Sequence, residues 1–388
     1  MGSVFVTNGD QRKAIPIVRS LGKRGIEVTV GGNSKLSPSF FSKYCKRKVV
    51  YPSPEKEPDN FINFMLEYLR AFHHEVLFAI DEGTCELVTK YIEEFSKLTI
   101  VPLPSHEIYS KARDKGETLK LAMRLGIPCP VTYFPEDSAE VEALSKRLSP
   151  PLVIKPRVSS GSRGIVYVNS IDQLVSSYMK VHFRYPNPLI QEFIPSGGDA
   201  YGVEILMNKD SEPRAVFVHR RLREYPVKGG PSTLRESIEY PELAEMGVKL
   251  LKALNWFGVS MVEFKVDPRD GVPKLMEINP KFWGSIQLPI VSGVDFPYLL
   301  YKVAVEGDIA PIREYKIGVM CRWLLPGDIL HFLSNKSRFN LQPSFFKFYD
   351  KNLYYDILSK EDPGPVLGTV AYYLLRILSP NSLRNLTR

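Results

Sequence analysis

Residues 259–285 read VSMVEFKVDPRDGVPKLMEINPKFWGS, and this stretch decides the fold that we expect. Val262, Phe264 and Val266 alternate with Glu263 and its neighbours, which is the period of a strand with Glu263 on the opposite face. Residues 267–271 then supply turn chemistry, and a second short apolar run follows over residues 275–279. The stretch therefore predicts a β-hairpin.

Three polar residues of this hairpin can share one face. Glu277 and Asn279 alternate with Ile278 on one strand, so their side chains point to the same side, and the hairpin can fold that side beside Glu263. Two carboxylates held together repel unless a cation lies between them, and carboxylate and amide oxygens suit Mg²⁺. The alternative is that both carboxylates are solvated on an ordinary exposed hairpin, because so short a motif has many false positives.

Composition places the chain among globular proteins. Its 388 residues are 44% hydrophobic and 24% charged, which excludes a disordered chain and allows two or three domains. The formal charge of +8 favours anionic partners, but the basic residues are spread along the whole length, so nucleic-acid binding is not expected. The four cysteines form no CxxC pair, and we interpret them as reduced thiols of a cytoplasmic protein without a zinc site: Cys45, Cys85, Cys129 and Cys321.

The first part of the chain has the pattern of an open parallel sheet. A strand over residues 4–7, a helix over 14–21 and a strand over 27–30 form a β-turn-α-β start, and further strand and helix patterns follow to about residue 104. No GxGxxG motif is present, so we predict no nicotinamide or flavin site. The loop Asp81–Thr84 follows a strand and is either a ligand-binding edge or the N-cap of the next helix.

Two lysines are candidates for phosphate binding. Residues 105–125 have a helical pattern that contains Lys115, although a single lysine on such a helix is usually solvated. Lys155 ends an apolar strand, and the loop after it contains Ser159, Ser160, Gly161, Ser162, Arg163 and Gly164. Small residues let backbone N–H groups approach phosphate, and Lys155 would add a charge. The loop is not a Walker A motif, and a flexible surface hairpin is the alternative.

Further candidate residues follow in the middle of the chain. Residues 189–194 have a strand pattern in which the backbone of Glu192 and Ile194 could meet an adenine edge, and Asp199 could accept hydrogen bonds from ribose hydroxyls. Arg220 and Arg221 begin a basic run that is either a solvated face or a means of neutralising an anionic substrate.

Beyond residue 310 the chain becomes aromatic-rich and basic. Residues 366–378 are apolar but too short to span a bilayer. They are interpreted as a core helix, with a peripheral membrane anchor as the alternative.

Taken in order, these elements resemble the ATP-grasp superfamily, and more closely its carbamoyl-phosphate-synthase-like carboxylate–amine ligases. The resemblance covers residues 1 to about 310 and rests on Asp114-Lys115, the VIKP run that ends at Pro156, the SSGSRG loop, the QEFI run and the EINP motif. It implies an α/β ATP-grasp fold with a Rossmann-like domain at 1–104 and an ATP-grasp domain at 105–310. A lid would cover about 128–193, and residues 311–388 would be an extension of unknown role.

The resemblance also implies a role for each candidate residue. Lys115, Lys155 and the loop 159–164 would bind the phosphates of ATP. Gln191, Glu192, Phe193 and Ile194 would line the adenine, and Asp199 would hold the ribose. Glu263, Glu277 and Asn279 would bind Mg²⁺ or Mn²⁺. Relatives often have arginine where this chain has Lys281, and lysine lacks the planar fork of that side chain.

The implied reaction is phosphorylation of a carboxylate by ATP, followed by attack of an amine on the acyl phosphate. Arg220, Arg221 and Lys281 would hold the acyl phosphate or the substrate carboxylate. The expected partners are small-molecule carboxylate and amine substrates, and a homodimer is left open. Two alternatives are an ATP-grasp carboxylase or carbamoyl-phosphate-type enzyme, and a non-enzymatic ATP-binding protein.

Overall fold

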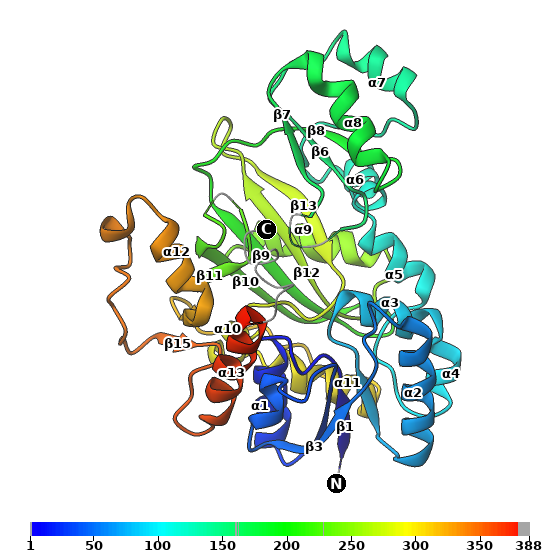
Figure 1. Cartoon of the computed structure of the whole chain (residues 1–388), viewed down its shortest axis with the longest axis vertical. Helices are drawn as coiled ribbons and strands as arrows, with labels where there is room; N and C mark the ends of the chain where they lie inside the picture. The colour runs from blue at the N-terminus through cyan, green and yellow to red at the C-terminus, as the bar shows by residue number, and fades with distance from the viewer. Residues whose placement is uncertain (1, 160, 162, 228, 379–388) are drawn as a thin grey trace.

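The computed structural model describes residues 2–159, 161, 163–227 and 229–378 in three sheets (Figure 1). The N-terminal sheet is parallel with the order β3-β2-β1-β4, as the β-turn-α-β pattern predicts. Its strands are β1 (Ser3–Val6), β2 (Glu27–Gly32), β3 (Cys45–Val50) and β4 (Val76–Phe78). The helices of this region are α1 (Ala14–Lys23), α2 (Pro58–Ala71), α3 (Glu82–Lys90) and α4 (Ile92–Ser96).

A second, smaller sheet stands apart at the top of Figure 1. It is antiparallel with the order β5-β8-β6-β7, and the helices α7 (Ser138–Ser145) and α8 (Leu174–His182) pack with it. Its strands are β5 (Thr132–Tyr133), β6 (Leu152–Lys155), β7 (Val166–Val168) and β8 (Leu189–Glu192). It has its own apolar core, which includes Leu152, Ile154 and Ile190. We call this unit the lid.

The third sheet has seven strands in the order β13-β12-β9-β10-β11-β14-β15. They are β9 (Ala200–Met207), β10 (Pro213–Glu224), β11 (Ser232–Ile238), β12 (Gly258–Val266), β13 (Pro273–Asn279), β14 (Met320–Arg322) and β15 (Leu353–Tyr355). Because β12 and β13 pair antiparallel across the turn at residues 267–272, the predicted hairpin is confirmed.

Both faces of this large sheet are buried. On one face Val203, Ile205 and Val262 join a core with helix α9 (Pro241–Ala253). On the other face Leu206, Phe217 and Met261 share a core with residues of the N-terminal sheet and with α10 (Gln287–Ser292) and α11 (Phe296–Glu306). The second face therefore meets the N-terminal domain, and it is the face that carries Glu263 and Glu277.

One helix was expected over residues 105–125, and this expectation is wrong. The structure has two helices, α5 (His106–Arg113) and α6 (Lys115–Arg124), because Asp114 has an extended backbone (ψ 109°). Its side chain accepts hydrogen bonds from the backbone N–H groups of Gly116 and Glu117, which caps α6. The break places Lys115 at the start of a helix.

The segment after residue 310 joins the large sheet. Strand β14 pairs with β11, and β15 pairs parallel with β14. Helix α13 (Gly364–Leu378) packs on the short helix η1 (Pro38–Phe41), so this segment also contacts the N-terminal domain. The domain limits at 104 and 310 stay predictions.

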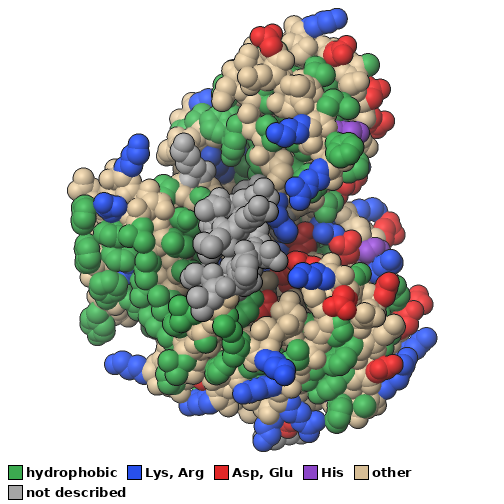
Figure 2. All heavy atoms as spheres, viewed as in Figure 1, with side chains coloured by type: hydrophobic (Ala, Val, Ile, Leu, Met, Phe, Trp, Pro, Cys, Tyr) green, Lys and Arg blue, Asp and Glu red, His purple; other side chains and the backbone are tan. Residues whose placement is uncertain are grey.

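Part of the same segment exposes apolar side chains. Figure 2 shows hydrophobic side chains gathered around α12 (Ile329–Ser334), and exposed ones there include Leu333, Phe339, Phe346 and Tyr349. Among the described residues, no helix is long and apolar enough to cross a membrane. The peripheral membrane contact stays a prediction.

Candidate active site

The hairpin places its two carboxylates directly opposite each other. Glu263 on β12 and Glu277 on β13 are cross-strand partners, so their side chains share one face of the sheet. Asn279 lies on the same face, and its Nδ2 atom donates a hydrogen bond of 2.8 Å to Glu263 Oε1. The structure therefore brings together the three predicted metal ligands, Glu263, Glu277 and Asn279.

Each of the two carboxylates is paired with a cation from elsewhere in the chain. Arg221 on β10 forms an ion pair with Glu263, reaching past the small residues Ala200 and Gly202 of β9. Lys115 Nζ lies 3.1 Å from Glu277 Oε2. Two negative and two positive charges thus balance at the hairpin, as the repulsion argument for paired carboxylates requires.

The donor set at this point fits a divalent cation. Among the described residues, no group of three acidic, histidine or cysteine side chains gathers to hold a metal ion. What the hairpin offers is two carboxylates and the amide oxygen of Asn279, which remains available because Nδ2 makes the bond to Glu263. Such an all-oxygen set suits Mg²⁺, which keeps several ligands from water or phosphate.

The two predicted phosphate-binding lysines both lie near Glu277. Lys115 Nζ also donates to the carbonyl oxygen of Ser159 at 2.7 Å, so it contacts the start of the phosphate loop. Lys155 Nζ donates to Gln191 Oε1 at 2.6 Å, and Glu277 contributes to the electrostatic environment of Lys155. These contacts bring the lid beside the hairpin.

Two glycines of the loop after Lys155 adopt a conformation that favours glycine. Gly161 and Gly164 have φ angles of 63° and 77°, a left-handed conformation that glycine adopts at little cost. Ser160 and Ser162, two of the predicted phosphate-loop residues, lie outside the described residues.

Lys281 connects the hairpin to the N-terminal domain. Its Nζ atom lies 2.6 Å from Glu82 Oε2, and Glu82 also accepts a hydrogen bond of 2.8 Å from Arg113 Nε. Asp81 accepts from Lys13 Nζ at 3.2 Å and makes no side-chain cap on α3. The loop Asp81–Thr84 therefore lies at the site, which supports its interpretation as a ligand-binding edge.

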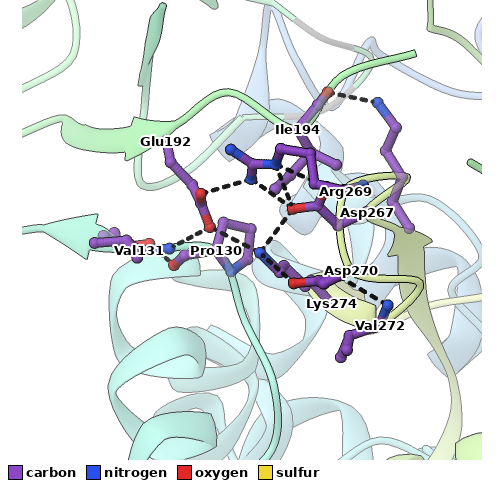
Figure 3. Close-up of polar contacts among 11 residues, drawn as sticks. Pro130, Val131, Glu192, Ile194, Asp267, Arg269, Asp270, Val272 and Lys274 are labelled. Atoms are coloured by element: carbon purple, nitrogen blue, oxygen red, sulfur yellow. Dashed lines mark hydrogen bonds and ion pairs between the residues drawn. The ribbon is translucent and has the colours of Figure 1, made fainter. Parts of the chain in front are cut away.

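Figure 3 shows that Glu192 lies in a cluster of charges at the tip of the hairpin. Its carboxylate accepts from the backbone N–H of Val131 at 2.9 Å, from Arg269 at 2.7 Å and from Lys274 at 3.1 Å. Burial raises the pKa of Glu192, but these donors lower it by more, so the net shift is downward. The carboxylate of Glu192 is thus bound by two cations of the hairpin.

The neighbouring backbone is held from the same side. Lys265 Nζ donates to the carbonyl oxygen of Ile194 at 3.0 Å, and Asp267, which is fully buried, binds both Arg269 and Lys274 (Figure 3). Phe193 packs edge-on against Tyr167 of the lid. The strand expected to line adenine is therefore fixed to the hairpin that carries the carboxylates.

Arg220 and Asp199 lie away from the carboxylate pair. Arg220 forms ion pairs with Glu236 and with Asp199, the latter at 3.5 Å, whereas its neighbour Arg221 contacts Glu263. Successive side chains of a strand point to opposite faces, so only one of the two arginines can reach the hairpin face. The structure does not bring Arg220 to the predicted phosphoryl site.

Sequence reasoning named Lys281 and the loop Asp81–Thr84, but it missed the contact between them and the residues that hold the predicted adenine strand. Glu82 and Lys281 are 199 positions apart, and Lys265, Arg269 and Lys274 hold a strand that ends at residue 192. No spacing rule connects such residues. The one available signal was the charge of the hairpin tip, where Asp267, Arg269, Asp270 and Lys274 follow each other within the predicted turn.

Replacing Arg269 with alanine tests the link between the hairpin tip and the adenine strand. We expect KM for ATP to rise about two- to fivefold with kcat little changed, because Arg269 is half-exposed and such pairs contribute modestly. Steady-state kinetics with varied ATP would measure this. The matched control is Lys252→Gln, which breaks an exposed pair with Glu212 elsewhere. Equal KM values in the two variants would contradict the expectation.

Comparison with known proteins identifies the domain that contains most of these residues. The family model for the ATP-grasp domain matches residues 112–285, which include both lysines and the hairpin. The chain is 22% identical over 274 residues to D-aspartate ligase of Enterococcus faecium and 26% identical over 258 residues to D-alanine--D-alanine ligase of Thermoanaerobacter. These matches cover 64% and 58% of this chain, and they span only 63% and 69% of the relatives' own lengths.

Solved structures agree at the level of the fold. Biotin carboxylase of Campylobacter jejuni superposes with a TM-score of 0.70 at 17% identity, covering 82% of this chain and 74% of that one. L-amino acid ligase of Bacillus licheniformis gives a TM-score of 0.61 at 19% identity, with 81% and 78% covered. The predicted α/β ATP-grasp fold and the family resemblance are thereby confirmed. Residues 112–285 therefore form an ATP-grasp domain, which lies within a chain that has the ATP-grasp fold.

Proposed function

We propose that this protein is an ATP-dependent ligase that activates a carboxylate as an acyl phosphate and joins it to an amine. The observation that carries the proposal is the opposed pair Glu263 and Glu277 with Asn279 beside it, flanked by Lys115 and Arg221. The similarity to D-aspartate ligase and D-alanine--D-alanine ligase supports a ligase. ATP, Mg²⁺, a carboxylate and an amine would be the reactants and cofactor. A homodimer, which the sequence leaves open, stays a prediction.

The residues of the site suit phosphoryl transfer, in which positioning and charge neutralisation do most of the catalysis. Lys115 and Lys155 would hold ATP phosphates from the helix start and from the lid. A bound Mg²⁺ on Glu263, Glu277 and Asn279 would neutralise phosphate charge. Arg221 lies beside Glu263 and can turn its guanidinium to the transferred phosphoryl group.

The second step needs the acyl phosphate to survive until the amine arrives. Lys281 is held at the domain boundary by Glu82, and burial lowers its pKa less than Glu82 and Asp81 raise it, so the net shift is upward. It therefore stays charged and can bind the acyl phosphate as a point charge, although without the planar fork of arginine. Closure of the lid over the site would exclude the water that hydrolyses such an intermediate.

The proposal is tested by measuring ADP and phosphate release with Mg²⁺ against a panel of carboxylates, each with and without a mixed pool of amino acids. A ligase releases phosphate only when an acid and an amine are both present. Bicarbonate-dependent release without an amine would instead support the carboxylase alternative. ATP binding without turnover in any combination would support a non-enzymatic protein.

The pKa of Lys155 gives a prediction for pH. Burial is the main reason why this pKa is lowered to about 8; Glu277 opposes the effect of burial, and Lys115 and Lys265 add to it. ATP binds the charged form of Lys155, so ATP binding raises the pKa of this lysine. The affinity for ATP is therefore highest well below pH 8 and falls as the pH rises above 8. We expect the Kd for ATP to increase about tenfold between pH 7 and pH 9.

The control for this titration is Lys155→Arg, whose guanidinium stays charged over the whole range. Isothermal calorimetry or a fluorescent nucleotide analogue would measure both proteins at each pH. A wild-type Kd that does not change between pH 7 and pH 9, or the same slope in the arginine variant, would contradict the role given to Lys155.

A further inference from the structure

Arg12 lies on the loop between β1 and α1 and binds residues from the far end of the chain. Its Nη1 atom donates to Asp356 Oδ2 at 2.8 Å, and its guanidinium stacks over the Trp323 ring at 3.9 Å. Asp356 and Trp323 belong to the segment beyond residue 310, for which the family resemblance implied no role. This segment thus orients a residue at the carboxyl end of a parallel strand, where ligands bind in such sheets.

The charges around Arg12 do not balance. Asp356 is fully buried and also forms an ion pair with Arg235, another fully buried side chain. One carboxylate therefore serves two guanidinium groups, and Arg12 has no other carboxylate partner among the described residues. Burial lowers the pKa of Arg12 to about 10 despite the opposing attraction of Asp356, which agrees with an incompletely compensated charge. These three side chains therefore carry one net positive charge, which a further negative group would neutralise.

The second edge of Arg12 faces the segment that follows the hairpin. A Cβ atom built on Gly284 would overlap Arg12 Nη2, so the guanidinium fits there only because residue 284 is glycine. The next residue, Lys13, donates to the carbonyl oxygen of Phe282 at 3.2 Å. The loop of Arg12 and the segment from Lys281 to Gly284 are thus in contact, and Lys281 is a candidate phosphoryl-site residue. About a seventh of the Arg12 side chain (14%) is exposed.

We propose that Arg12 binds a substrate carboxylate that does not itself react. This inference rests on the proposed ligase function and narrows its substrate class: one of the two substrates carries an extra free carboxylate, either on the amine, as in an α-amino acid, or on the acid, as in a dicarboxylic acid. Asp356 and Trp323 act as positioning residues that fix the guanidinium. A planar guanidinium can bind such a carboxylate through two parallel hydrogen bonds.

The test compares each substrate with its primary amide, which keeps the shape and removes the charge. One arm uses amino acids and amino acid amides as the amine, and the other uses dicarboxylic acids and their monoamides as the acid. We expect wild type to prefer the free acid by about ten- to a hundredfold in kcat/KM in one arm only, the range of a charged hydrogen bond. In Arg12→Gln this preference should fall to near one, because kcat/KM falls for the free acid and stays unchanged for the amide.

The matched control is Arg24→Gln, a second arginine near the end of α1 that also stacks on an aromatic ring, that of Tyr298. It should keep the wild-type preference. If Arg12→Gln does not fold, Gly284→Ala gives the same test, because the added methyl group displaces the guanidinium. An unchanged preference in the Arg12 or Gly284 variant would overturn the proposal.

Failure of the ligase proposal has a different signature, namely no phosphate release by wild type with any pair of substrates. The role of Arg12 is then read from binding, as the rise in melting temperature caused by each acid and by its amide in the presence of a non-hydrolysable ATP analogue and Mg²⁺. A rise with an acid that its amide and Arg12→Gln both lack supports the site. Equal rises overturn it.

Discussion

Replacing Glu277 with glutamine is expected to reduce phosphate release about a hundred- to a thousandfold, the loss typical when one strong electrostatic contact at a reacting phosphoryl or acyl group is removed. Glutamine keeps the shape of the side chain but removes the charge that faces Glu263 across the hairpin and pairs with Lys115 at 3.1 Å. Both the Mg²⁺ site and the position of Lys115 depend on that charge. The loss should appear in kcat, because these contacts strengthen as the phosphoryl group is transferred.

The stability of this variant should be close to that of wild type. Glu277 is partly exposed, and its removal also relieves the repulsion between two carboxylates that are direct cross-strand partners. Urea unfolding would check this point. The matched control for activity is Glu236→Gln, which removes a carboxylate that pairs with Arg220 on the neighbouring strand. If the Glu277→Gln variant keeps more than a tenth of the wild-type rate, the hairpin is not part of the catalytic site.

The hairpin could be predicted from the sequence because its signals are local. Alternation around Glu263, a turn at Asp267–Gly271 and the spacing of Glu277 and Asn279 all lie within one stretch, and the pairing of two such strands leaves few alternatives. The lysines were predicted for a different reason: the order of motifs along the chain resembles a family, and the family model and the fold agree with it.

Other elements could not be predicted because their cause is tertiary. Strands β14 and β15 have three residues each. Strand β14 forms on the edge of β11 and β15 on the edge of β14, and no local pattern marks so short a strand. The break at Asp114 depends on a cap and on Arg157, which binds Asp114 from another element. The different directions of Arg220 and Arg221 follow once β10 is known to continue through them, whereas the sequence shows only a basic run.

The place of the C-terminal segment leads to a second large effect, on stability. Asp362 is buried with Arg19 of α1: Arg19 Nε donates to its Oδ2 atom at 2.9 Å, and Ser42 Oγ and the backbone N–H of Lys43 each donate to the carboxylate at 2.8 Å. The two side chains are only 2% and 8% exposed. Replacing Asp362 with alanine leaves a buried guanidinium without its carboxylate, which costs about 3–5 kcal/mol of unfolding free energy.

Urea unfolding followed by circular dichroism would measure this loss, and the neighbouring residue supplies the control. Glu361 forms an exposed pair with Lys23 of the same helix, so Glu361→Ala should change the free energy of unfolding by less than about 0.5 kcal/mol. Because the segment adds two strands to the large sheet and packs on the N-terminal domain, Asp362→Ala should lower the unfolding midpoint of the N-terminal domain and the large sheet together. An early separate transition, with the remaining unfolding at the wild-type midpoint, would instead show that residues beyond 310 unfold independently of the ATP-grasp domain.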